Sequence, residues 1–135
     1  MSRSLDVIVW GATGFTGQLV SEYLLRTYGV GKDLNWAIAG RNQEKLDQLN
    51  RVLGAQIPTL IADSKDRPSL DALVEQTAVV CTTVGPYAKY GSELVAACVN
   101  AGTHYCDLSG EVPWMHDMIG KHSDQAQSSG ARIVH

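Results

Sequence analysis

The sequence is poor in features that several classes of protein require. Only three of its 135 residues are cysteines, Cys81, Cys98 and Cys106, and no two of them form a C-x-x-C pair. An odd number without such a pair argues against a disulfide framework and suits a reducing compartment. Each cysteine falls within an apolar strand or helix pattern, so we expect three buried thiols with a packing role.

Long apolar runs and clusters of positive charge are also missing. No stretch approaches the roughly 20 apolar residues that cross a bilayer, and the first residues do not resemble a secretory signal. Lysine and arginine number 11 against 14 acidic residues, and the net charge is −3, which disfavours nucleic-acid binding. We therefore expect a soluble, cytoplasmic chain with no membrane segment and no nucleic-acid partner.

What the chain does contain is an alternation of short apolar runs with longer segments of helical spacing, and its length suits one domain, residues 1–135. Right-handed crossovers between such units predict an α/β fold: a doubly wound parallel sheet, the Rossmann fold, with strand order 3-2-1-4-5-6 and helices on both faces. The expected strands are Leu5–Trp10, Asn35–Ala39, Thr59–Ala62, Ala78–Val84, Thr103–Asp107 and Ala131–His135.

Apolar residues at helical spacing predict a helix in each of the five connections. Asn42 can cap the second helix, and Gly102 and Gly130 can end the fourth and fifth. The expected inward faces are, in chain order, Phe15, Leu19, Val20, Tyr23 and Leu24; Leu46, Leu49 and Leu53; Leu70, Leu73 and Val74; Leu94, Val95 and Cys98; and Trp114, Met118 and Ile119.

The run GATGFTG, residues 11–17, follows the first strand and opens into the first helix. In such a loop Gly11 permits a tight turn, Gly14 lets backbone approach a pyrophosphate, and Gly17 lets the helix pack closely on the sheet. The positive end of the helix dipole favours the phosphates further. The predicted phosphate site is Gly11, Thr13, Gly14, Phe15, Thr16 and Gly17.

The end of the second strand indicates which dinucleotide binds. NAD sites place an acidic residue there to bind the ribose hydroxyls, whereas this sequence has Arg41 followed by Asn42. An arginine can form a forked ion pair with a 2′-phosphate and stack on adenine. We therefore predict NADP, with NAD the less favoured cofactor, and count Arg41 and Asn42 in its site. The alternative is a solvated arginine at the start of a helix.

Two further loops complete the predicted cofactor site. Asp63, after the third strand, either accepts a hydrogen bond from the adenine amino group or caps a turn through Ser64. Val84, Gly85, Pro86 and Tyr87 lie after the fourth strand, at the switch point where the nicotinamide ribose is expected. For that loop the alternative is a simple strand-to-helix turn.

Four blocks of the sequence, GATGFTG, AGRNQEKL, VGPYAKYG and GTHYCDLSGE, resemble in order the saccharopine dehydrogenase-like oxidoreductase family. The resemblance implies an N-terminal NAD(P)-binding Rossmann domain, with its phosphate loop at residues 11–17, a 2′-phosphate contact at Arg41 and a nicotinamide-side loop at residues 85–87. It places residues 107–111 near the substrate. Members of the family continue into a larger substrate domain, and some are described as enoyl reductases.

The sequence therefore favours the NADP-binding domain of an oxidoreductase that transfers hydride to or from a small organic substrate held by a domain absent from this chain. We expect the isolated chain to be inactive and assign no catalytic residue, because Asp107 and Glu111 suit acid–base work and turn capping equally well. Exposed edge strands make a homo-oligomer plausible.

Two alternatives stay open, a stand-alone NADP(H) sensor or regulatory module and an atypical short-chain reductase or epimerase. Tyr28 and Lys32 fit the Y-x-x-x-K pattern of short-chain reductases, but they are expected at the end of the sheet opposite the cofactor. No metal site is predicted, because the spacing of His104, Cys106 and their neighbours matches no tight ligand pair.

Overall fold

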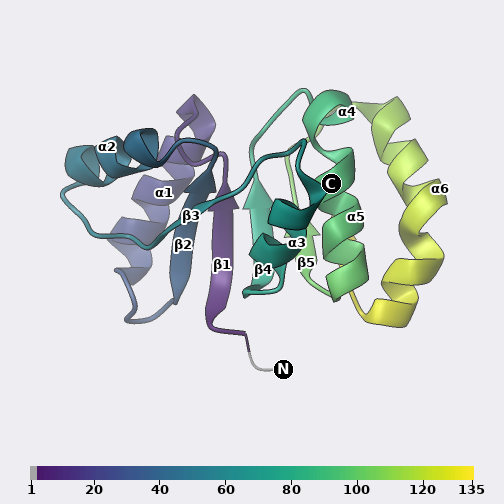
Figure 1. Ribbon diagram of the computed structural model, residues 1–135, viewed down its shortest axis with the longest axis horizontal. Helices are drawn as coiled ribbons and strands as arrows, with labels where there is room; N and C mark the ends of the chain where they lie inside the picture. Colours follow the sequence, from purple (N-terminus) through teal and green to yellow (C-terminus); the bar gives the residue numbers. More distant parts are fainter. Residues whose placement is uncertain (1–2) are drawn as a thin grey trace.

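In a computed structural model, residues 3–135 form one six-stranded sheet with helices on both faces (Figure 1). The strand order is β3-β2-β1-β4-β5-β6, and every neighbouring pair is parallel. This confirms the predicted doubly wound order. The strands are β1 (Leu5–Trp10), β2 (Trp36–Gly40), β3 (Thr59–Ile61), β4 (Thr77–Thr82), β5 (His104–Cys106) and β6 (Ile133–Val134).

The helices divide between the two faces as a doubly wound sheet requires. Residues of α1 and α2 pack in one core, and residues of α3, α5 and α6 pack in the other. In Figure 1, α2 lies at the left of the view, α5 and α6 lie at the right, and α3 is drawn over β4. The short α4 follows β4 near the carboxyl edge of the sheet. The bounds are α1 (Phe15–Tyr28), α2 (Gln43–Leu53), α3 (Arg67–Val74), α4 (Tyr87–Tyr90), α5 (Ser92–Ala101) and α6 (Val112–Ser129).

Each face of the sheet carries its own core. Neighbouring strand residues point to opposite faces, so Ile8 of β1 packs in the larger core with Val80 and Tyr105, whereas Val9 packs in the smaller one with Ile38. All five are at most 1% exposed. β1 is therefore covered on both faces, as expected for the central strand of a parallel sheet.

The predicted strand bounds are correct for β1 and differ by one or more residues elsewhere. β4 ends at Thr82 instead of Val84, because the backbone turns there and the Val84 N–H donates to the Thr82 hydroxyl at 3.2 Å. Among the described residues, the strands β5 and β6 are also shorter than predicted. The sequence analysis missed α4, whose four residues are too few to show a helical period.

The predicted inward face of α1 is wrong for three of its five residues, whereas Val20 and Leu24 are partly buried and pack against the smaller core as predicted. Phe15, Leu19 and Tyr23 are 84%, 52% and 61% exposed, and the fully buried residues of this helix are Gly17 and Ser21. The helix meets the sheet through small residues because its first turn lies directly against the glycine loop. Phe15, Leu19 and Tyr23 therefore stay on the exposed side of the helix.

The other helices follow the prediction with one exception. Leu46 and Leu49 of α2 are buried, the apolar faces of α3 and α5 are buried, and Gly102 and Gly130 end α5 and α6 in the left-handed conformation. In α6, Trp114 and Met118 are buried, but Ile119 is 56% exposed, so that part of the predicted face is wrong.

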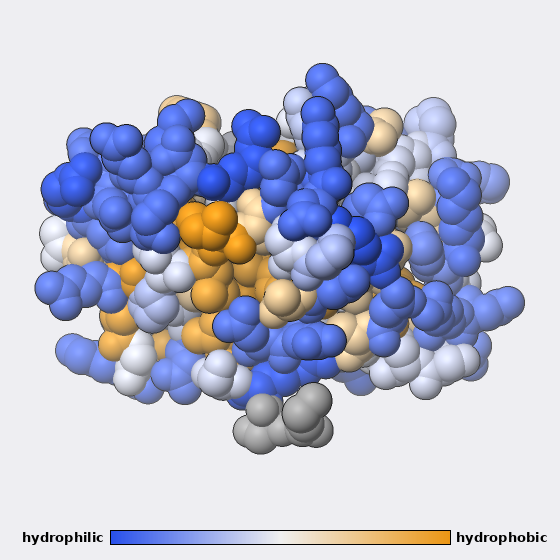
Figure 2. All heavy atoms as spheres, viewed as in Figure 1, coloured by the Kyte–Doolittle hydropathy of each residue, from blue (hydrophilic) through white to orange (hydrophobic). Residues whose placement is uncertain are grey.

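The visible face of the molecule is mostly polar, with an apolar patch over β2 and β3 (Figure 2). Ile61 of β3, an edge strand of the sheet, is 49% exposed. Within residues 3–135, no helix is both long and apolar enough to cross a membrane.

Candidate dinucleotide site

A cleft of about 350 Å³ lies at the carboxyl ends of the central strands. It brings together six residues of the predicted cofactor site, Gly11, Thr13, Gly14, Arg41, Val84 and Gly85. Its lining also includes residues that the sequence analysis did not assign to the site, namely Trp10, Gly40, Ser64, Thr83 and Tyr90. In an open parallel sheet this position is where ligands bind.

The three glycines of the GATGFTG loop differ in how much space a side chain would have at each position. Gly11 has a φ of +78°, and a Cβ there would lie 2.2 Å from Cγ2 of Val84. A Cβ on Gly17 would lie 2.1 Å from the Gly11 carbonyl oxygen. At Gly14 the nearest atom to a Cβ would be the same oxygen, at an ordinary 3.5 Å. Packing within the chain therefore excludes side chains at Gly11 and Gly17 but leaves space at Gly14.

The amino terminus of α1 opens at this loop. No side chain caps the helix, and its first turn holds no acidic residue. The first N–H groups of a helix and its dipole together attract an anion. The loop and the helix start therefore fit a pyrophosphate, with Phe15 and Thr16 able to contribute backbone N–H groups rather than side chains.

Arg41 lies beside the cleft with its side chain exposed, and no acidic residue lines the cleft. Asn42 caps α2, since its side-chain oxygen accepts a hydrogen bond from the Lys45 N–H at 3.1 Å. The predicted cap is therefore confirmed. The contacts of Arg41 and Asn42 with the cofactor stay predictions.

After β3, the structure favours the turn that was one of the two alternatives for Asp63. Its carboxylate accepts a hydrogen bond from the Lys65 N–H at 2.9 Å, and its own N–H donates to the Ser69 hydroxyl at 3.0 Å. Ser64 lines the cleft instead. An adenine contact from Asp63 stays a prediction.

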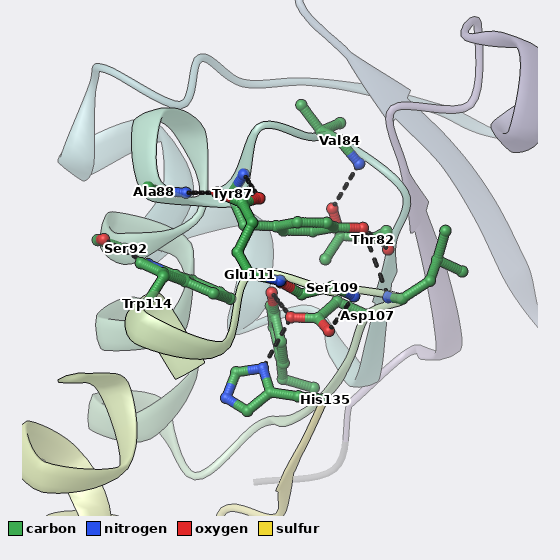
Figure 3. Close-up of polar contacts among 12 residues, drawn as sticks. Thr82, Val84, Tyr87, Ala88, Ser92, Asp107, Ser109, Glu111, Trp114 and His135 are labelled. Carbon is green, nitrogen blue, oxygen red and sulfur yellow. Dashed lines mark hydrogen bonds and ion pairs between the residues drawn. The ribbon is translucent and has the colours of Figure 1, made fainter. Parts of the chain in front are cut away.

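The loop after β4 is held in place from behind by α6 and the segment before it (Figure 3). The N–H groups of Tyr87 and Ala88 donate to the two carboxylate oxygens of Glu111, at 2.5 and 3.1 Å. The Tyr87 ring is buried and stacks on Trp114, with 5.5 Å between the ring centroids. The Gly85–Pro86 peptide is cis. Val84 and Gly85 thus face the cleft, whereas Tyr87 anchors the loop.

Asp107 is the centre of a second buried network at the end of β5 (Figure 3). Its side chain is 0% exposed and accepts hydrogen bonds from the Tyr105 hydroxyl at 2.7 Å and the Ser109 N–H at 2.9 Å. Nδ1 of His135 lies 2.9 Å from the same carboxylate. Asp107 and Glu111 therefore have partners within the chain, which favours the turn and capping alternative for both.

Burial raises the pKa of the two tyrosines beside these networks, Tyr87 and Tyr105. Tyr105 also donates its hydroxyl hydrogen bond to the Asp107 carboxylate. Both phenols are therefore protonated at neutral pH. The sequence analysis missed Tyr105 and His135, because their contact with Asp107 depends on the register of β5 against β6, which the predicted sheet order does not give.

The fold separates two other candidate groups from the cleft. Tyr28 ends α1, and Lys32 follows it in the connection that leads into the amino end of β2. The cleft lies at the opposite, carboxyl end of the strands, in agreement with the position that we expected for this pair. Among the described residues, no three His, Cys, Asp or Glu side chains gather into a metal-binding group.

The sheet order, the glycine loop and the cleft define a dinucleotide-binding Rossmann domain. Residues 7–134 match the family described as the saccharopine dehydrogenase NADP binding domain, and the chain belongs to this family. Its cofactor is NADP.

Known proteins resemble the chain over nearly its whole length. It is 42% identical over 135 residues to a trans-acting enoyl reductase of Mycobacterium tuberculosis, a match that covers 98% of the chain and 32% of that protein. The structure of saccharopine dehydrogenase (L-Glu forming) from Saccharomyces cerevisiae superposes with a TM-score of 0.69 at 18% identity, over 96% of the chain and 26% of that protein.

A second solved structure shows the same fold. Citrobacter sp. triphenylmethane reductase, complexed with NADP(H), superposes with a TM-score of 0.68 at 20% identity, over 95% of the chain and 48% of that protein. The chain thus spans about a third of the length of the curated relatives that it matches.

Proposed function

We propose that the cleft holds NADP(H) for hydride transfer in an oxidoreductase similar to the trans-acting enoyl reductases, and that the substrate is an activated carbon–carbon double bond such as that of an enoyl thioester. The observation that carries the cofactor part is the space at Gly14, the one glycine of the loop that packing does not require. When bound, NADPH supplies the hydride. The residues of this chain bind and orient the cofactor.

Each part of the cleft has a role in this proposal. The N–H groups at the start of α1 bind the pyrophosphate, and Arg41 binds the 2′-phosphate. Val84 and Gly85 lie against the nicotinamide half. Glu111 holds the loop of these two residues through the Tyr87 and Ala88 N–H groups. This fixed wall keeps the nicotinamide in one position, as hydride transfer requires.

The cofactor contacts are tested by displacement of bound NADPH, measured by its fluorescence. We expect 2′,5′-ADP to displace it far better than 5′-ADP from the wild-type chain, and this preference to disappear in Arg41→Ala. Arg41→Lys, which keeps the charge and loses the fork, should retain part of the preference. Equal displacement by the two nucleotides from the wild-type chain would remove Arg41 from the 2′-phosphate site.

The hydride part is tested by adding an enoyl thioester to the NADPH complex. We expect the chain to bind NADPH without consuming it, because the residues that hold the substrate belong to the part of the relatives that this chain does not match. NADPH oxidation by the wild-type chain that is faster than oxidation by the Gly14→Ala variant would show that this chain alone can act on the substrate. That result would contradict the expected need for a separate substrate domain and would support the reductase chemistry.

A further inference from the structure

Cys81 and Cys106 lie side by side on neighbouring strands. They are register partners in the parallel pair of β4 and β5, so their side chains point to the same face of the sheet. Adjacent strands lie about 4.8 Å apart, which falls within the Cα separation of roughly 4.4–6.8 Å that a disulfide spans. The backbone therefore places the two sulfurs within reach of each other.

This pair lies on the less covered face of the sheet. Cys81 is the register partner of Val9, which packs in the core beneath α1 and α2. Those helices pack mainly on β1, β2 and β3. Both cysteines are half-buried, whereas Cys98 of α5 is 0% exposed in the opposite core. Our prediction of a buried thiol is therefore confirmed for Cys98 and wrong for the other two.

The two thiols also interact. A hydrogen bond from Cys81 to the Cys106 sulfur lowers the pKa of Cys106 to about 7, although burial and the nearby Asp107 carboxylate oppose this shift. The same bond, together with burial, raises the pKa of Cys81. Burial raises the pKa of Cys98. Because the thiolate is the nucleophile in sulfur chemistry, Cys106 is the most reactive of the three cysteines.

We propose that Cys81 and Cys106 form a modification site, a cross-strand pair of thiols that a peroxide or a small disulfide oxidises to an intramolecular disulfide. With hydrogen peroxide, the Cys106 thiolate attacks one oxygen, the O–O bond breaks, and the released hydroxide takes up a proton to become water. Cys81 then attacks the Cys106 sulfenic acid; the S–S bond forms and the S–OH oxygen leaves as a second water, taking the Cys81 proton. The two thiols lose two electrons and the peroxide gains them.

The cross-link would join two strands just before the loops of the dinucleotide site. β4 leads into residues 83–87 and β5 into residues 107–111, and Glu111 already ties these loops together. The inference itself requires only the register and the exposure of the pair, so it does not depend on the proposed reductase activity.

The test is controlled oxidation of the folded chain with hydrogen peroxide, followed by intact mass and a count of free thiols after unfolding. We expect the wild-type chain to lose 2 Da and two of its three thiols, a Cys81–Cys106 peptide to appear in a digest, and a dithiol reductant to restore the original mass. Cys98→Ser should lose the same 2 Da.

Cys81→Ser and Cys106→Ser are the matched variants, since serine is close to cysteine in size. Circular dichroism checks that each is folded. Neither should lose 2 Da; Cys81→Ser should instead gain 16 Da, because its Cys106 sulfenic acid has no partner. A cross-link to Cys98, disulfide-linked dimers, or an unchanged mass when a control dithiol peptide is fully oxidised would each overturn the proposal.

Discussion

Gly14 and Gly17 are three positions apart in one loop, yet a methyl group meets different surroundings at each. At Gly17 it would lie 2.1 Å from the Gly11 carbonyl oxygen, and at Gly14 it would have ordinary 3.5 Å contact with the same atom. The backbone at Gly14 is extended, with a φ of −74°. Folding and cofactor binding therefore make separate demands on this loop.

We predict that Gly14→Ala keeps the melting temperature of the wild-type chain within a few degrees and weakens NADPH binding by about tenfold or more, because the methyl group takes the space of the pyrophosphate. Gly17→Ala should lower the free energy of unfolding by about 1–3 kcal/mol through overpacking. Thermal unfolding with and without NADPH separates the two effects. Equal loss of stability in both variants would contradict this assignment.

Arg41 carries the prediction on cofactor choice. Arg41→Ala should weaken NADPH binding by about tenfold or more, the size of a charged hydrogen bond, and change NADH binding little. Arg51→Ala is the control, since Arg51 is an exposed residue of α2 whose guanidinium donates to the Gln48 side chain. Calorimetric titration measures all four affinities. Equal weakening of both cofactors would show that Arg41 does not read the 2′-phosphate.

Among the residues of the cleft, those expected nearest the phosphates carry the clearest local sequence signal. The spacing of the glycines after a strand identifies the loop, and a missing acid after the second strand identifies Arg41. Trp10, Ser64 and Tyr90 reach the cleft from three separate segments. No local pattern marks them, because their approach depends on how those segments are arranged around the sheet.

At the scale of whole elements, caps and contact faces decide where each helix begins and how it lies. Asn42→Ala should lower the free energy of unfolding by about 1 kcal/mol, because the Lys45 N–H loses its partner. Asn42→Ser should be nearly neutral, since serine caps equally well. Chemical denaturation measures both. An unchanged stability in Asn42→Ala would mean that the cap contributes nothing.

The nicotinamide-side loop depends on α4 and the Glu111 carboxylate. Glu111→Gln exchanges one of two acceptor oxygens for an amide group, so one of the Tyr87 and Ala88 N–H groups loses its charged partner. We expect a loss of about 1–3 kcal/mol in stability and weaker binding of NADPH, with 2′,5′-ADP binding unaffected because it contacts the other half of the cleft. Equal loss of both ligands would contradict this division.

Helical spacing predicted α2, α3 and α5 because large apolar side chains form their contact faces. It also predicted α1, but it missed that Gly17 and Ser21 are the buried residues of that helix, because a search for bulky residues passes over small ones. Close approach of a helix to a strand is a property of the pair of elements, and the glycine loop was the only sequence signal for it.

For the whole molecule, handedness was enough to predict the sheet order, since right-handed crossovers leave few ways to join these strands. The buried network of Tyr105, Asp107 and His135 could not be predicted in the same way, because it depends on the register between β5 and β6, which handedness does not fix. The chain matches about a third of its relatives' length.

The most direct test of the whole account is a calorimetric titration of the wild-type chain with NADPH and, separately, with NADH. We predict one site per chain and NADPH binding tighter by about tenfold or more, because the 2′-phosphate would contact Arg41 and the pyrophosphate the start of α1. Heat with neither cofactor, or tighter binding of NADH, would contradict the central claim that this cleft is an NADP site.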